Sequence, residues 1–293
     1  MGYKITVIGG TNTDICGSCG GTMLMEDSNP GKVTVSPGGV ARNIAHDLCL
    51  MGAEVCFISA FGCDGFSRTT YADCKNLGMD VSLSYVSETE QGSTYLYVTD
   101  KHGALTVGIN DMDIVSRISP EFLAERLDRI NSSDAVVIDT NLSEEALEYI
   151  CLNCAAPLYC DPVSYKKAAR IKPWLSKLRG IKPNRGEAEA LTGTADADYA
   201  AAALIKAGVK TAFVSICEGG VVAADGRDII HMPAGEISLV NDAGAGDAAM
   251  AAMVLADVMK LNLQDAARLS MKAAALTCES ESANSPRLKE MFS

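Results

Sequence analysis

The 293-residue sequence predicts an α/β protein with a central, mostly parallel sheet that is covered by helices on both faces. Short apolar runs, each long enough for one buried strand, alternate with helical segments from residue 4 to residue 259. Polar residues stand at the ends of several runs, where parallel sheets bind ligands: Asp14, Asp161, Asn184, Ser215 and Asp247. The chain shows no internal repeat and no low-complexity linker, so we expect residues 1–293 to form a single domain.

Two segments interrupt the alternation of strands and helices. Residues 14–34 are rich in glycine, serine and threonine and have no helical period. Residues 92–108 have the pattern of a β-hairpin that turns near His102 and Gly103. Both segments would fit a small sheet that stands apart from the main body, and such a sheet can close over a site as a lid.

The first strand is predicted over residues 4–8 and ends at Gly9-Gly10. Asn12 and Asp14 follow at alternating positions, so both side chains point to one face if the segment is extended. That placement suits a ligand-binding pair. The alternative is local turn chemistry, in which both side chains bond their own backbone.

A second motif opens with Gly38-Gly39, which begins a helix that continues to Met51. The glycines allow a ligand to approach the backbone closely. Asn43, in the first helical turn, is suited to hydrogen-bond a polyol. Arg42 lies in the same turn, and we interpret it as a surface charge rather than an anion contact.

The rest of the chain supplies the remaining elements of the predicted sheet and its covering helices. Further strands are predicted over residues 54–60, 135–139, 158–161, 178–182 and 211–215, and further helices over residues 68–77, 143–153, 184–191 and 248–259. An extended apolar run, residues 237–240, leads to the glycine-rich turn before the last of these helices.

That glycine-rich turn is predicted to bind an anion. Gly244 and Gly246 allow close approach, and the helix start adds a partial positive charge. A carboxylate at this point, Asp247, would repel a phosphate unless it had a chemical role. Deprotonating a hydroxyl that attacks a phosphoryl group is such a role, and an ordinary helix cap is the alternative.

Two common nucleotide-binding patterns do not explain the turn. The Walker A pattern, GxxxxGK followed by serine or threonine, is absent. Gly244, Gly246 and Ala249 fit the dinucleotide fingerprint, but that fingerprint opens the first βαβ unit of its fold, whereas this turn lies near residue 293.

Composition excludes several classes of function. The net charge of −12 and the lack of a basic run argue against nucleic-acid binding, and no apolar stretch reaches the length of a membrane span. The N-terminal residues do not have the pattern of a signal peptide, and the eleven scattered cysteines indicate reduced thiols in a cytoplasmic protein. The pairs Cys16/Cys19 and Cys151/Cys154 lack histidines at ligand spacing, so we do not expect a structural metal.

Four short motifs resemble, in the same order, those of the ribokinase-like (PfkB-type) carbohydrate and nucleoside kinases. Residues 9–14 resemble the N-terminal substrate motif, and Gly38-Gly39 with Asn43 resembles the di-glycine hinge. Residues 184–187 resemble the N-x-x-E motif, and residues 244–247 resemble the anion hole with its catalytic aspartate. The resemblance covers nearly the whole chain. It implies a ribokinase-like three-layer sandwich with a small β-sheet lid, and ATP-dependent phosphorylation of a hydroxyl.

The resemblance also implies roles for individual residues. The expected catalytic base is Asp247, with the anion hole formed by Gly244, Ala245 and Gly246. The expected substrate-binding residues are Asn12, Asp14, Gly38, Gly39, Asn43 and Asn110. The expected nucleotide-binding residues are Asn184, Ser215, Glu218 and Gly220, and those expected to organise Mg²⁺ through water are Asn184 and Glu187. The expected partners are a small-molecule nucleoside and ATP, with room for a monovalent cation such as K⁺, in a homodimer that pairs through the lid.

Within the family, several stretches are similar to the branch that phosphorylates the 5′-hydroxyl of pseudouridine: residues 27–32, 36–45, 109–112, 161–164 and 182–185. The alternatives are another nucleoside or a free sugar such as ribose, and a sugar-binding sensor without catalysis, which the intact Asp247 disfavours. Two positions depart from the family pattern, Asp242 and Cys217, where relatives usually carry a small or hydroxyl residue and a glycine. The sequence names neither a role for Asp242 nor the residue that recognises the base.

Overall fold

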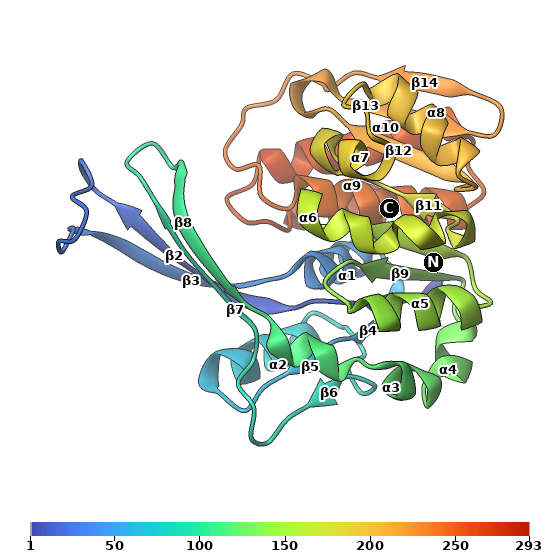
Figure 1. Ribbon diagram of the computed structural model, residues 1–293. Coiled ribbons are helices and arrows are strands. Elements are labelled where there is room, and N and C mark those ends of the chain that lie inside the picture. The colour runs from blue at the N-terminus through green and yellow to red at the C-terminus, as the bar shows by residue number, and fades with distance from the viewer. Residues whose placement is uncertain (1, 293) are drawn as a thin grey trace.

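In the computed structural model, residues 2–292 are described, with all of their side chains except that of Glu218. They contain a central sheet with the strand order β14-β13-β12-β11-β10-β9-β1-β4 (Figure 1). Its strands are β1 (Lys4–Ile8), β4 (Glu54–Ile58), β9 (Ala135–Asp139), β10 (Leu158–Asp161), β11 (Gly180–Ile181), β12 (Thr211–Ser215), β13 (Val221–Asp225) and β14 (Ile229–Met232). The strands from β12 to β4 pair in parallel, whereas β13 and β14 each pair antiparallel with the strand before them. The prediction of a mostly parallel sheet is confirmed.

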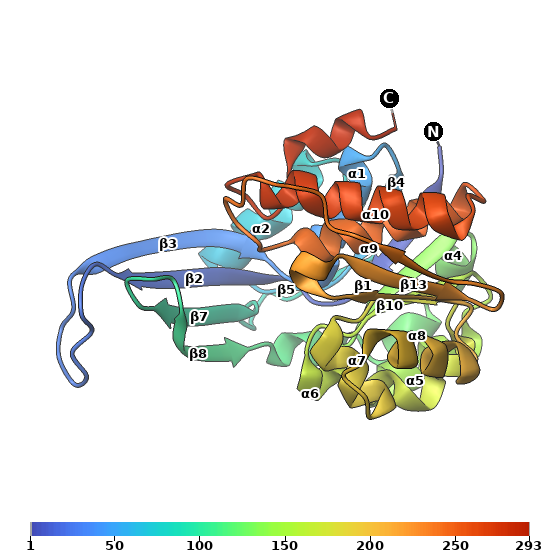
Figure 2. The ribbon, with the colours of Figure 1, turned by 90° about the horizontal axis from the view of Figure 1, so that it is seen from above.

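Helices cover both faces of this sheet (Figure 2). One face carries α1 (Val40–Leu50), α2 (Gly65–Asn76), α9 (Ala245–Val258) and α10 (Leu263–Cys278), and the other carries α3 (Pro120–Ala124), α4 (Leu127–Asn131), α5 (Glu144–Asn153), α6 (Tyr165–Ala168), α7 (Arg185–Thr192) and α8 (Ala197–Lys206). Short 3₁₀ turns are η1 (Asp113–Arg117), η2 (Ala169–Lys177), η3 (Cys217–Gly219) and η4 (Pro286–Glu290). Successive side chains of β9 point to opposite faces of the sheet. Val136 packs in the core beneath the helices that include α5, and Val137 packs in the core beneath the helices that include α9. The predicted three-layer sandwich is therefore confirmed.

A smaller sheet projects from the edge where the parallel strands of the central sheet end (Figure 1). Its strand order is β3-β2-β7-β8, formed by β2 (Asn12–Cys19), β3 (Gly31–Gly38), β7 (Thr94–Thr99) and β8 (Leu105–Asp111). Both strand-rich segments of the sequence contribute to it, each extending slightly beyond the predicted bounds. A two-stranded ladder of β5 (Ala60–Phe61) and β6 (Tyr85–Val86) lies apart from both sheets. The function of the small sheet as a lid stays a prediction.

The register of the small sheet gives it two chemically different faces. Asp14 lies opposite Tyr95, and Tyr95 lies opposite Asn110, so all three side chains share one side. This side, which we call the inner face, carries Asn12, Asp14, Cys16, Tyr95, Tyr97 and Asn110. The opposite side, the outer face, carries Val33, Val35, Leu96, Val107 and Ile109, all of them exposed.

The structure differs from the sequence prediction in several places. The strand predicted over 178–182 shrinks to Gly180–Ile181, because residues 176–178 leave a 3₁₀ turn to enter it. The antiparallel strands β13 and β14 were not predicted, although Asp225-Gly226 between two apolar runs is a hairpin signal. The apolar run 237–240 is not part of a sheet, and Leu239 and Val240 are exposed. No helix of the described residues is long and apolar enough to cross a membrane.

Candidate active site

A glycine turn begins α9 at the position that the sequence analysis predicted to bind an anion. Gly244 caps the helix in the left-handed region with φ 80°. A Cβ built at this position would lie 2.0 Å from the carbonyl oxygen of Ala283, so only glycine fits. The first N–H groups of an α-helix have no acceptor within the helix, which makes this turn suited to bind an anion. Asp247 lies in this same turn and is 9% exposed.

Asp247 is held by a residue of the second motif. The Nδ2 atom of Asn43, in the first turn of α1, donates a hydrogen bond of 2.9 Å to Oδ2 of Asp247. Burial raises the pKa of Asp247 to about 8, and the nearby carboxylate of Asp161 adds to the increase. The hydrogen bond from Asn43 and the charge of Lys182 act in the opposite direction. A carboxylate with its pKa near neutrality is matched to general base catalysis.

The raised pKa of Asp247 predicts a stability effect with a defined sign. The pKa of Asp247 rises from 3.8 to about 8 on folding. Its contribution to the free energy of unfolding is therefore fully present below pH 4 and is lost as the pH rises through 8. The Asp247→Asn variant carries no ionisable group there. We expect its melting temperature to exceed that of the wild type by a margin of a few degrees or more at pH 9 that disappears at pH 4.

Thermal unfolding across pH 4–9 measures this effect. Asp242→Asn is the matched control, because Asp242 is an exposed carboxylate of the same loop. A difference in melting temperature that does not change with pH would show that burial does not raise the pKa of Asp247.

Lys182 is a site residue that the sequence analysis missed. Its Nζ atom lies 3.4 Å from Oδ2 of Asp161, and both side chains are buried. A Cβ built at Gly246 would lie 3.3 Å from the same Nζ atom, so the ammonium group stands beside the anion site. Burial lowers the pKa of Lys182, but its acidic neighbours, Asp161 first, hold it above the ordinary value. Its position could have indicated a role in the site, because Lys182 directly follows β11 and other site residues likewise lie at the ends of their strands.

Arg42 is buried, and its interpretation as a surface charge was wrong. The side chain is 5% exposed and pairs with Asp73 at 2.7 Å. Its Nη1 atom also donates to the side-chain oxygens of Asn43, at 3.2 Å, and of Asn284, at 2.8 Å. Asn284 in turn donates to the backbone oxygen of Asn43 at 3.1 Å. This network fixes the amide that contacts Asp247, and it could not be predicted because Asn284 lies 241 residues from Asn43.

The predicted substrate residues lie together at the base of the small sheet. Nδ2 of Asn12 donates to Oδ1 of Asp14 at 2.6 Å, and a Cβ at Gly38 would collide with the same carboxylate. Gly39 caps α1 with φ 104°, where a Cβ would lie 2.6 Å from the carbonyl oxygen of Gly10. Asn110 is further out, on β8, and shares the inner face with Asp14. The structure therefore brings Asn12, Asp14, Gly38 and Gly39 together and leaves their contacts with a substrate as a prediction.

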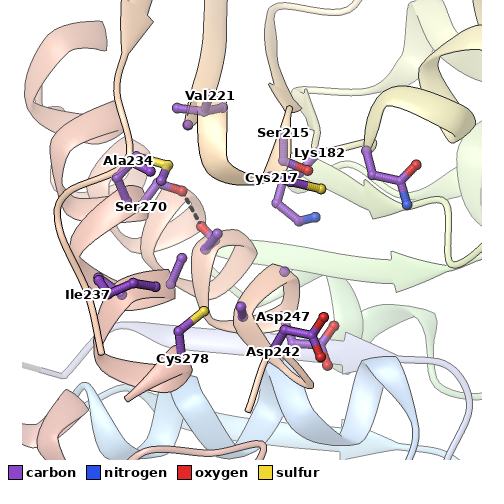
Figure 3. Close-up of a pocket in the computed structure, with 18 of the residues that line it drawn as sticks. Lys182, Ser215, Cys217, Val221, Ala234, Ile237, Asp242, Asp247, Ser270 and Cys278 are labelled. Carbon is purple, nitrogen blue, oxygen red and sulfur yellow. Dashed lines mark hydrogen bonds between the residues drawn. The ribbon is translucent and has the colours of Figure 1, made fainter. Parts of the chain in front are cut away.

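A cavity of about 580 Å³ opens beside Asp247 (Figure 3). Its lining includes the predicted residues Asn184, Ser215, Gly220, Glu187, Ala245, Gly246 and Asp247. The sequence analysis missed the contribution of α10, whose residues Ser270, Met271, Ala274, Ala275 and Cys278 line the cavity at helical spacing. Ala234 and Ile237, from the segment between β14 and α9, line the cavity on the same side as α10. The cavity is large enough for a small-molecule ligand and mostly apolar away from Asp247.

Cys217 and Asp242, the two residues that depart from the family pattern, both line this cavity. Cys217 has φ 51°, a left-handed conformation that explains why a glycine is usual there, and a non-glycine residue costs about 1 kcal/mol or more. The side chain of Glu218, a predicted nucleotide contact, lies outside the described part of the structure. The carbonyl oxygen of Asp242 accepts the N–H of Ala245 at 3.3 Å, and its exposed side chain has no role that we can derive.

Asn184 and Glu187 form the start of α7. Their side chains and backbone N–H groups exchange hydrogen bonds of 2.8–2.9 Å in a capping box. Burial and the charge of Asp161 raise the pKa of Glu187 to about 7. The described residues hold no group of three or more side chains arranged as a metal cage. Mg²⁺ needs only one or two carboxylates and keeps several waters, and it would offset the charges of Glu187 and Asp161, so the residues fit it.

An anion-binding helix start, a buried carboxylate and a buried lysine beside one cavity are typical of phosphoryl-transfer enzymes. Comparison with known proteins gives the family. The description "pfkB family carbohydrate kinase" matches residues 3–290, and the chain belongs to this family.

Individual relatives cover nearly the whole chain. Pseudouridine kinase of Escherichia coli strain K12 is 33% identical over 292 residues, which cover 97% of this chain and 93% of that protein. Guanosine-inosine kinase of Exiguobacterium acetylicum is 29% identical over 284 residues, or 93% of both chains. Ribokinase of Arabidopsis thaliana, solved with ribose and ATP, has a TM-score of 0.85 at 18% identity, covers 100% of this chain and 99% of its own, and shows the fold alone. The chain is thus a sugar or nucleoside kinase, a type of enzyme that uses ATP to phosphorylate a hydroxyl.

Proposed function

We propose that this kinase transfers the γ-phosphoryl group of ATP to the 5′-hydroxyl of pseudouridine, giving pseudouridine 5′-phosphate and ADP. The observation that carries the chemistry is the contact between Asn43 and Asp247, because it joins the sugar-side motif to the carboxylate at the anion site. The substrate assignment rests on the similarity to the Escherichia coli pseudouridine kinase and on the sequence stretches shared with that branch of the family.

In the proposed mechanism, Asp14 and Asn12 bind the ribose hydroxyls, and Gly38 and Gly39 let the sugar approach the backbone. Asp247 accepts the proton of the 5′-hydroxyl as that oxygen attacks the γ-phosphorus. The N–H groups at the start of α9 stabilise the charge that develops on the transferred phosphoryl group, at roughly 3–4 kcal/mol per donor in comparable sites.

ATP occupies the cavity along α10, with Ser215 and Gly220 beside it. Lys182, held in place by Asp161, adds a positive charge next to Gly246 and offsets the negative charge that gathers there. Mg²⁺ held through water by Asn184 and Glu187 would neutralise the phosphates of the nucleotide. A monovalent cation such as K⁺ near the loop of Asp242 would support the same anion site. Closure of the small sheet excludes water.

A panel of acceptors tests the proposal. ADP release is measured with Mg-ATP and pseudouridine, uridine, adenosine or ribose, and kcat/KM is compared among the four. We expect the highest value with pseudouridine. A preference for ribose or adenosine would replace the substrate assignment by the alternative of another sugar or nucleoside kinase. Absence of ADP release with every acceptor would favour a sugar-binding sensor.

The outer face of the small sheet supports the homodimer that the sequence suggested. Its five exposed apolar residues include Val33, which is 72% exposed, and Ile109, which is 62% exposed. Exposed apolar side chains on three strands of one sheet face are unusual on a free surface, and a second copy of the same sheet would cover them. We therefore expect two chains to pair through their outer faces.

Sedimentation equilibrium tests this pairing. The wild type should have twice the 30.8 kDa mass of one chain, and Ile109→Lys should have the mass of a single chain. Val86→Lys is the matched control, because Val86 is an exposed valine in β6, outside the small sheet. A monomeric wild type, or a dimer that survives Ile109→Lys, would contradict the expected interface.

A further inference from the structure

The inner face of the small sheet carries an aromatic pair that the mechanism above does not use. The rings of Tyr95 and Tyr97 are stacked, with centroids 5.0 Å apart and an interplanar angle of 22°. Both side chains are half-buried, and neither belongs to the two hydrophobic cores of the described residues. The stacked pair therefore lies on the inner face of the small sheet, outside both hydrophobic cores.

The ring of Tyr95 extends over a glycine of the neighbouring strand. Gly108 lies opposite Tyr97 on the neighbouring strand β8. A Cβ at Gly108 would lie 2.8 Å from the hydroxyl oxygen of Tyr95 and 3.0 Å from its Cε2 atom. The Tyr95 ring therefore extends across a position without a side chain, so no neighbouring side chain of β8 displaces it there.

The aromatic pair continues the row of sugar-binding residues outward. Tyr95 lies directly opposite Asp14, and Tyr97 lies opposite Cys16, one row further from the central sheet. Rows on one face are separated by roughly 7 Å, twice the rise of a strand residue. When the ribose of a nucleoside binds at Asp14, its base can therefore reach the rings of Tyr95 and Tyr97, which lie in the same row and in the next row. Asn110, opposite Tyr95, adds an amide at the edge of the same surface.

From this placement we infer that Tyr95 and Tyr97 form a stacking platform for the nucleobase, which makes the enzyme a nucleoside kinase rather than a kinase of free pentoses. Aromatic side chains bind bases by stacking with little dependence on base identity, so the platform selects a nucleoside over a sugar. The inference rests on the proposed kinase function, because it takes the sugar to lie at Asp14.

Equilibrium binding and kinetics of variants test the platform. Tyr97→Ala and Tyr95→Ala should each weaken the binding of pseudouridine roughly tenfold or more, measured by calorimetry without ATP, and should raise KM by a similar factor. The affinity for ribose should stay within about twofold. Tyr97→Phe, which keeps the ring, should bind pseudouridine like the wild type. Gly108→Val, which places a side chain against the Tyr95 ring, should weaken nucleoside binding without removing an aromatic residue.

Tyr199→Ala is the control for the loss of a tyrosine, because Tyr199 is 73% exposed on α8. If the alanine variants lost affinity for pseudouridine and for ribose by the same factor, the inference would be overturned, since the rings would then have a structural role. Unchanged pseudouridine binding would also overturn it. Failure of the proposed function gives a different result, namely no ADP release by the wild type with any acceptor, and the calorimetric comparison still decides the role of the platform.

Discussion

The Asp247→Asn variant is expected to lower kcat at least a hundredfold while KM for the nucleoside and for ATP stays within a few-fold. Asparagine keeps the shape of the side chain and can still accept the hydrogen bond from Asn43, but it cannot take up the proton of a hydroxyl. Steady-state kinetics of ADP release measure the effect. In the wild type, kcat/KM should rise with pH toward about pH 8, because the base must be ionised in the free enzyme.

Asp128→Asn is the control, because Asp128 is an exposed carboxylate of α4 that does not line the cavity, and it should leave kcat close to the wild-type value. If Asp247→Asn retained kcat within about tenfold, Asp247 would not be the base. Asp247 would then act only as an acidic residue in the first turn of α9, which favours the helix dipole, because Gly244 is the cap and no side chain of the described residues caps this helix.

The Lys182→Met variant is expected to lower kcat/KM by about a hundredfold or more, which is the usual effect of removing one charge-stabilising donor from such a site. The ammonium group is buried beside Gly246. Because Lys182 also lowers the pKa of Asp247, its loss should move the rise of kcat/KM to a higher pH. The measurement is kcat/KM as a function of pH.

Removing Lys182 leaves Asp161 buried without its partner, so the single variant is expected to be less stable. The double variant Lys182→Met/Asp161→Asn removes both charges and should recover stability without recovering activity. Lys210→Met is the control at an exposed lysine that likewise adjoins a strand. Full activity of the folded double variant would mean that Lys182 has only a structural role.

Much of the fold could be predicted because the strands are short and buried on both faces. Residues 135–139 read as one apolar run, and they form a fully buried strand with the predicted bounds. The hairpin of β13 and β14 was not predicted because both strands are short and β13 contains Ala223 and Ala224, whose preference for strands is low. The bounds of β11 were predicted poorly because tertiary pairing, rather than local pattern, decides where so short a strand ends.

The candidate site shows what local sequence reveals and what it does not. Gly244 and Asp247 could be recognised because a glycine turn before a helix has a local signature. The environment of Asp247 could not, since Asn43 approaches from 204 residues away and Asp161 and Lys182 come from other strands. The burial of Arg42 depends on Asn284, which folds back from the C-terminal segment. Such roles depend on contacts between residues far apart in the sequence, which no short motif reveals.

Phosphorus NMR of the reaction product is the most direct test of the central claim that the chain phosphorylates a nucleoside at its 5′-hydroxyl. Pseudouridine and Mg-ATP are incubated with the enzyme, and the phosphorus signal of the product is recorded with its couplings to the sugar protons. The account predicts a monophosphate coupled to the two C5′ protons and formed in equal amount with ADP. A phosphate on another hydroxyl, or ADP accompanied only by free inorganic phosphate, would contradict it.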